Sequence, residues 1–301
     1  MNEQYHIPVL LKETLEYLNI KPDGIYIDST FGGGGHSKAI LERLSHKGRL
    51  IAFDYDQESL NNEFNADNFI LIYANFAFIP YFLDFLNIDK VDGIIADLGL
   101  SSHQIDTAER GFSFRFDSEL DMRMNKNIEI TAKHIVNTYS IERLQDIFSR
   151  YGQIHNSASL ARRIVMGRSK SKIETTQDLV EVIKPLVPKK MEQKYLAKVF
   201  QAIRIEVNSE IENLKAFLSN LPEILKKGGR VAIITYHSVE DRLVKNFLKY
   251  GNFQGVMQTD LYGNPLRSFR LITKKPVVPN ANEIMNNPRS RSAKLRVAEL
   301  I

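Results

Sequence analysis

Short apolar runs alternate with amphipathic segments over the first hundred residues of the chain. Buried strands are expected at residues 25–28, 50–54, 69–73 and 93–97. Candidate helices lie between these runs and begin near His36, Gln57 and Phe78. Because alternation of strand and helix is typical of right-handed βαβ units, this part predicts a parallel sheet covered by helices on both faces.

The alternation stops at about residue 104 and resumes near residue 195. Between them the pattern predicts helices alone, at residues 141–150, 157–165 and 177–187. Later elements are helices at 210–225 and 238–249, a turn at Gly228-Gly229, and strands at 230–236, 268–273 and 295–298. The sequence therefore predicts an α/β, Rossmann-like, mostly parallel doubly wound sheet from residues 1–104 and 195–301, with a helical insertion at 105–194.

Composition narrows the class of protein and the kind of partner. The chain is 43% apolar and 25% charged, and no apolar run approaches the length of a membrane helix. It contains no cysteine, which excludes disulfides and thiolate metal sites. Basic residues outnumber acidic ones by eleven to four in residues 159–204 and by eight to two in 265–301. We therefore expect a cytoplasmic protein, without membrane contact, that binds nucleic acid.

A glycine-rich segment, Asp28-Ser29-Thr30-Phe31-Gly32-Gly33-Gly34-Gly35-His36, joins the first strand to the first of these helices. Glycines at such a turn let the backbone approach a nucleotide-like ligand closely. The second strand ends in Asp54, about 20 residues further on, where a carboxylate can accept hydrogen bonds from ribose hydroxyls. Together these features predict a site for an adenosine-containing ligand.

Four polar residues follow predicted strands at their carboxyl ends: Asp28, Asp54, Asp97 and His237. Ligands of open α/β sheets bind at that edge. The glycines lack the G-x-G-x-x-G spacing of dinucleotide enzymes, and no P-loop lysine follows them. This favours S-adenosylmethionine. A nicotinamide-dependent oxidoreductase, a non-catalytic RNA-binding protein and a methyltransferase acting on a small molecule or protein remain alternatives.

Seven motifs, in order along the chain, then identify a family. They are D-S-T-F-G-G-G-G-H-S, D-L-G-L-S-S-H-Q, A-E-R-G-F-S-F-R, L-D-M-R-M, F-Q-A-I-R-I-E-V-N-S-E, H-S-V-E-D-R and N-P-R-S-R-S-A-K-L-R. Together they resemble the bacterial 16S ribosomal RNA cytosine-N4 methyltransferases of the RsmH (MraW) family. The resemblance implies a class I methyltransferase domain and S-adenosylmethionine as donor. It also implies a cytosine in the decoding region of 16S rRNA as target, in the assembled small subunit, and no metal.

The resemblance also implies which residues contact the cofactor. These are Gly34, Gly35, His36, Asp54, Phe76, Asp97 and Gln104. Gly33, in the same glycine turn, is also expected to contact the cofactor. Phe76 follows the third strand, where an aromatic ring can cover adenine. Relatives often have serine after this phenylalanine, whereas this chain has alanine.

Further roles are hypotheses about catalysis and RNA binding. Asp97 and the carbonyl of Leu98 would accept hydrogen bonds from the cytosine amine. His237 would accept the amine proton or hold the base, or else it only makes hydrogen bonds at the start of a helix. Residues expected to bind RNA are Arg204 and Asn208, four apart on one helix face, and Arg289 and Arg291 near the C-terminus.

Overall fold

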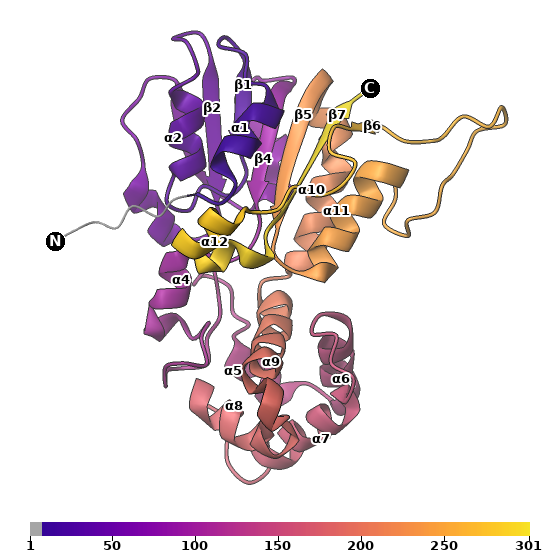
Figure 1. The fold of residues 1–301 in the computed structure, drawn as a ribbon. Helices are drawn as coiled ribbons and strands as arrows, with labels where there is room; N and C mark the ends of the chain where they lie inside the picture. The colour runs from indigo at the N-terminus through magenta and orange to yellow at the C-terminus, as the bar shows by residue number, and fades with distance from the viewer. Residues whose placement is uncertain (1–7) are drawn as a thin grey trace. The chain divides into compact units, whose positions relative to one another are not determined.

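The computed structural model describes residues 8–301, which form two compact units (Figure 1). The first unit takes in the chain up to Gly99 and again from Ile211 to Ile301. The second unit is Leu100–Glu210, inserted into the first. The insertion was predicted at 105–194, so the unit in the structure begins a few residues earlier and ends later.

The first unit is built on a sheet of seven strands in the order β3-β2-β1-β4-β5-β7-β6 over the described residues. The strands are β1 (Ile25–Asp28), β2 (Arg49–Asp54), β3 (Phe69–Tyr73), β4 (Val91–Asp97), β5 (Leu225–Thr235), β6 (Phe269–Leu271) and β7 (Lys294–Leu300). Strands β1 to β5 are parallel, whereas β7 runs antiparallel to both β5 and β6. The predicted mostly parallel, doubly wound sheet is confirmed.

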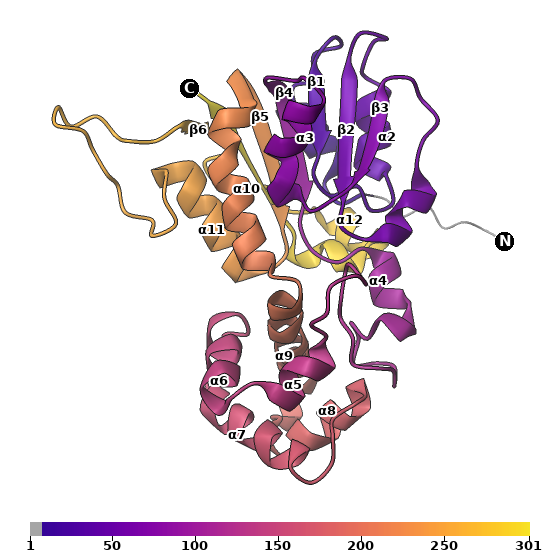
Figure 2. The ribbon, with the colours of Figure 1, turned by 180° about the vertical axis from the view of Figure 1, so that it is seen from behind.

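Each face of the sheet has its own apolar core, because successive strand residues point to opposite faces. Ile27 of β1 belongs to one core and its neighbour Tyr26 to the other. The first core also contains residues of α3 (Ile79–Phe85), α10 (Glu210–Ile224) and α11 (Ser238–Tyr250). The second contains residues of α1 (Leu11–Leu18) and α2 (Gly35–Leu41). Figures 1 and 2 show helices of the two sets from opposite sides.

The start of β5 differs from the prediction. A turn was expected at Gly228-Gly229, but β5 already begins at Leu225, directly after α10. The register against β4 shifts here, from Val91 opposite Leu225 to Gly93 opposite Arg230. Gly228 takes a positive φ of 78°. The two glycines therefore lie in an irregular stretch inside the strand, where a bulge accommodates the extra residues.

The regular elements of the second unit are all helices, joined by loops. The α-helices are α4 (Ser102–Asp106), α5 (Ala132–Thr138), α6 (Ile141–Arg150), α7 (Ser157–Arg168), α8 (Thr176–Ile183) and α9 (Glu192–Val207). Helix α9 packs against α5 and α6, which explains why this unit extends beyond residue 194. Across residues 8–301, none of the helices has the length and apolar character needed to span a membrane.

Candidate active site

The glycine turn joins β1 to α2, and its four glycines meet different surroundings. Gly34 has a φ of 74°, and a Cβ there would come within 2.6 Å of the Phe64 ring. A Cβ on Gly35 would overlap the ring of Pro8. Around Gly32 and Gly33, in contrast, a Cβ would meet no atom within 4 Å. The turn is thus closely packed on one side and open at Gly33, where a ligand can approach the backbone.

Hydrogen bonds tie the turn to the strands on either side of β1. The Thr30 hydroxyl accepts from the backbone N–H of Asp97 at 2.6 Å, which connects the turn to β4. The backbone N–H of Gly32 donates to the Asp54 carboxylate at 2.6 Å, which connects it to β2. The other oxygen of Asp54 accepts from the backbone N–H of Asp56 at 2.8 Å. Asp54 and the glycine turn are therefore joined directly by a hydrogen bond.

Three neighbouring strands, β2, β1 and β4, end in Asp54, Asp28 and Asp97. Burial raises the pKa of Asp54 to about 6 and that of Asp28 to about 6. Burial likewise raises the pKa of Asp97 to about 7, with further increases from the charges of Asp28 and Glu240. Buried carboxylates this close together are unfavourable unless a cation faces them. A positively charged ligand beside these carboxyl groups would offset the cost of ionising them.

Asp97 has two side chains beside its carboxyl group. The Tyr236 hydroxyl donates to its Oδ1 at 2.8 Å, and His36 Nδ1 lies 3.9 Å from its Oδ2. His36 is buried, and its Nε2 lies 3.2 Å from the Val9 carbonyl oxygen, which can only accept. The His36 proton therefore belongs on Nε2, and Nδ1 faces Asp97. The Asp97 side chain is 22% exposed, so a ligand can still reach it.

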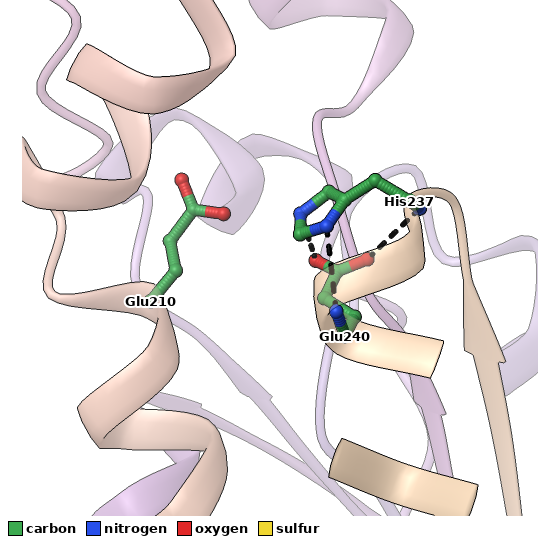
Figure 3. A group of neighbouring side chains, drawn as sticks. All are labelled: Glu210, His237 and Glu240. Carbon is green, nitrogen blue, oxygen red and sulfur yellow. Dashed lines mark hydrogen bonds and ion pairs between the residues drawn. The ribbon is translucent and has the colours of Figure 1, made fainter. Parts of the chain in front are cut away.

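His237 is the N-cap residue of α11 (Figure 3). Its Nδ1 accepts from the backbone N–H of Glu240 at 3.4 Å, and its Nε2 lies 3.1 Å from Glu240 Oε1. Glu240 in turn accepts from the backbone N–H groups of Tyr236 and His237. These contacts fit the helix-start role of His237, whereas a role as proton acceptor stays a prediction.

Phe76 and Gln104 were expected beside the cofactor. Phe76 follows β3 and packs edge-to-face against Phe217 at 5.3 Å, while part of its side chain stays accessible. Gln104 forms a capping box with Ser101 at the start of α4, and it is buried. Gln104 belongs to the second unit, whereas Phe76 shares the first unit with the glycine turn. Cofactor contact by either residue stays a prediction.

The four residues expected to bind RNA fall into two groups. Arg204 forms a two-pronged ion pair with Glu210, and its side chain is 13% exposed. Asn208 is buried and bonds to the backbone of Met122 and Met124. Both side chains therefore make contacts within the second unit, and RNA binding by either residue stays a prediction.

Arg289 and Arg291, by contrast, are exposed. They lie in the short 3-10 helix η6 (Pro288–Ser292) that precedes β7. β7 begins at Lys294, opposite Thr235 at the carboxyl end of β5. The two arginines therefore belong to the same edge of the sheet as the three aspartates.

The sequence pattern predicts Asp28 as a strand-end residue without a specific role, and it predicts no site role for Tyr236 or Glu240. Glu240 had a signal, because it follows His237 by three residues, the spacing of a capping box. Tyr236 had none, because a strand-end tyrosine shows no partner in the sequence.

A family profile and the sequences of related proteins both identify the same family. The profile of the MraW methylase family matches residues 3–301. A protein of Bacteroides fragilis strain YCH46, named ribosomal RNA small subunit methyltransferase H, is 55% identical over 98% of this chain and 97% of its own length. A protein of the same name from Flavobacterium johnsoniae is 53% identical over 99% of this chain and 98% of its own.

The sheet order and the glycine turn after β1 are those of a class I, Rossmann-like methyltransferase. More specifically, the chain belongs to the MraW methylase family. The predicted family, enzyme class and cofactor, S-adenosylmethionine, are thereby confirmed. Membership also decides against the nicotinamide-dependent alternative.

Proposed function

We propose that this chain methylates the N4 amine of a cytosine in the decoding region of 16S ribosomal RNA, within the assembled small subunit in the cytoplasm. Relatives above 50% identity are named for the methylation of small-subunit ribosomal RNA. The single observation that carries the methyl-donor side of this proposal is the row of aspartates at the ends of β2, β1 and β4, whose ionisation a cationic donor would favour.

The residues around the glycine turn suit the parts of this donor. Asp54 would accept hydrogen bonds from the ribose hydroxyls. Phe76, after the neighbouring strand β3, would cover the adenine. The open space at Gly33 would admit the methionine end, and His36 and Asp97 would line the approach to it.

Asp97 would also serve the acceptor base. S-adenosylmethionine, when bound, supplies a methyl group activated by a positively charged sulfur. The Asp97 carboxylate and the Leu98 carbonyl would accept hydrogen bonds from the cytosine amine, which orients the nitrogen for in-line attack. Formation of the C–N bond would break the methyl–sulfur bond and leave neutral S-adenosylhomocysteine. The amine would lose one proton, which the Asp97 carboxylate, with a pKa of about 7, would accept near neutral pH. This transfer requires no metal, because the sulfonium already activates the methyl group.

The carboxyl edge of the sheet offers a basic surface for the RNA. Arg289 and Arg291 are exposed beside the strand ends, where phosphate contacts would hold the substrate over Asp97. Since a base inside folded RNA cannot reach such a site, the target cytosine must be turned out of its stack.

Transfer of a labelled methyl group tests the proposal. The protein is incubated with labelled S-adenosylmethionine and small ribosomal subunits from cells lacking the enzyme, and the modified nucleotide is mapped. Free 16S RNA serves as the parallel substrate. We expect label on N4 of a decoding-region cytosine, with subunits the better substrate. Label on large-subunit RNA, on protein, or on no RNA would contradict the proposal.

A further inference from the structure

Tyr236 is the residue directly after β5, and it contacts the loop that follows β4 in two ways. Its hydroxyl donates to Asp97 Oδ1 at 2.8 Å. Its ring packs against Gly99, where a Cβ would lie 3.1 Å from the ring carbon Cδ2. Gly99 has a φ of 123°, a conformation that side-chain-bearing residues rarely adopt. The Tyr236 side chain thus contacts both the Asp97 carboxyl group and the loop that follows Asp97.

The charged neighbours of Asp97 make this contact matter. Asp28 on β1 and Glu240 on α11 disfavour a negative charge on Asp97, as burial does. His36 of α2 faces its other oxygen, and Glu283, in the short helix α12 (Ala281–Asn286), adds negative charge near Tyr236. The hydrogen bond from Tyr236 acts in the opposite direction and lowers the pKa of Asp97.

We propose that Tyr236 is a positioning residue for methyl transfer, whose hydroxyl orients the Asp97 carboxylate toward the methyl donor. This inference rests on the proposed role of Asp97. Tyr236 contacts neither donor nor RNA in this scheme, and it acts through Asp97. The tyrosine itself stays protonated, because burial and the adjacent Asp97 raise the pKa of its hydroxyl. It therefore remains a hydrogen-bond donor at any working pH.

Tyr236→Phe isolates the hydroxyl from the ring. The phenyl ring keeps its packing against Gly99, so the fold should be retained. Loss of the donor raises the pKa of Asp97, so that less of it is ionised at neutral pH and the cationic donor binds more weakly. A hydrogen bond to a charged group is worth about one pKa unit, so its loss should raise the pKa of Asp97 by about that amount. The smaller ionised fraction near pH 7 then lowers the affinity for S-adenosylmethionine roughly fivefold. Higher pH should restore the affinity.

Glu240→Gln provides a variant with the opposite sign. It removes a negative charge near Asp97. Its single side-chain oxygen can still accept the backbone hydrogen bonds, while its amide nitrogen takes the place of Oε1 beside His237 Nε2. The pKa of Asp97 should fall, and donor binding should persist to lower pH than in the unmodified protein. A merely structural weakening of the site would not shift the two variants in opposite directions.

The test is calorimetric titration of S-adenosylmethionine into the unmodified protein, Tyr236→Phe and Glu240→Gln, from about pH 6 to about pH 9. The donor's own amine titrates in this range, but identically for all three proteins. We expect the midpoint of affinity against pH to rise for Tyr236→Phe and fall for Glu240→Gln.

Two results would overturn this inference while leaving the proposed function intact. One is an unchanged midpoint in Tyr236→Phe, and the other is a loss of affinity in that variant that high pH does not restore. Failure of the unmodified protein to bind the donor would instead reject the proposed function itself.

Discussion

At the scale of single residues, the site holds carboxyl groups in positions where their ionisation destabilises the folded protein. Asp28, Asp54 and Asp97 have pKa values raised by burial, so each ionised carboxylate costs stability in the free protein. A cationic ligand reverses this cost, because the same charges then attract it. An electrostatic cost of this kind is expected at a site that is adapted to bind a ligand rather than to stabilise the free protein.

Asp97→Asn should therefore stabilise the free protein and disable the enzyme. The folded-state pKa of about 7 exceeds the ordinary value of 3.8, so stability falls as pH rises between them and the full cost is present above pH 7. Removing the charge should raise the free energy of unfolding at about pH 8 by up to about 4 kcal/mol. Thermal unfolding at about pH 5 and about pH 8 measures this, with the larger gain at the higher pH. Full turnover with unchanged donor affinity in this variant would contradict both proposed roles of Asp97.

Gly33 tests the open side of the glycine turn. A methyl group there meets no protein atom within 4 Å, so Gly33→Ala should fold normally but project into the space proposed for the donor. We expect at least about a tenfold loss of donor affinity, equivalent to about 1.4 kcal/mol, with little change in melting temperature. Gly34→Ala is the contrasting variant, because its positive φ and the Phe64 contact predict loss of stability as well. Unchanged affinity in Gly33→Ala would place the donor elsewhere.

At the scale of elements, the sequence predicted what local patterning controls. Strands β1 and β3 and helix α6 have the expected bounds, because apolar periodicity and turn residues mark their ends. Irregular β5 could not be predicted, since its bulge depends on pairing with β4. The partners of Arg204 and Asn208 were equally hidden. The sequence indicates that a basic or polar side chain on a helix can form hydrogen bonds, but it does not indicate with which partner. It therefore does not predict that Arg204 bonds to Glu210 or that Asn208 bonds to the backbone of Met122 and Met124.

The start of α11 separates a capping histidine from a catalytic one. If His237 acts only as the N-cap, His237→Ala should cost about 1 kcal/mol of stability, and His237→Asn should restore it because asparagine is a good cap. Denaturant unfolding and single-turnover methylation of both variants measure this. We expect turnover of His237→Asn within about threefold of the unmodified protein, well short of the loss for a general base. Stable folding with turnover reduced a hundredfold or more would instead establish a catalytic role.

At the scale of the whole molecule, three aspartates and two arginines of the first unit lie along one edge of the sheet. The three aspartates end their strands there, and η6 with Arg289 and Arg291 precedes β7 at the same edge. A cationic donor and a polyanionic RNA therefore find opposite charges within one unit. This arrangement follows from topology, because antiparallel β7 begins where the parallel strands end.

Salt dependence distinguishes phosphate contacts by these arginines from a general effect of charge. Arg289→Ala/Arg291→Ala should weaken small-subunit binding and reduce the slope of log affinity against log salt by about 1.4, since each phosphate contact on single-stranded RNA contributes about 0.7. Lys47→Ala/Arg49→Ala is the matched control, because it removes two exposed positive charges near the start of β2, at the opposite edge of the sheet. We expect the control to leave the slope unchanged and both variants to bind S-adenosylmethionine normally. Equal slopes for the two double variants would mean that the arginines contribute only to overall charge, and the substrate would then have to approach Asp97 across another surface.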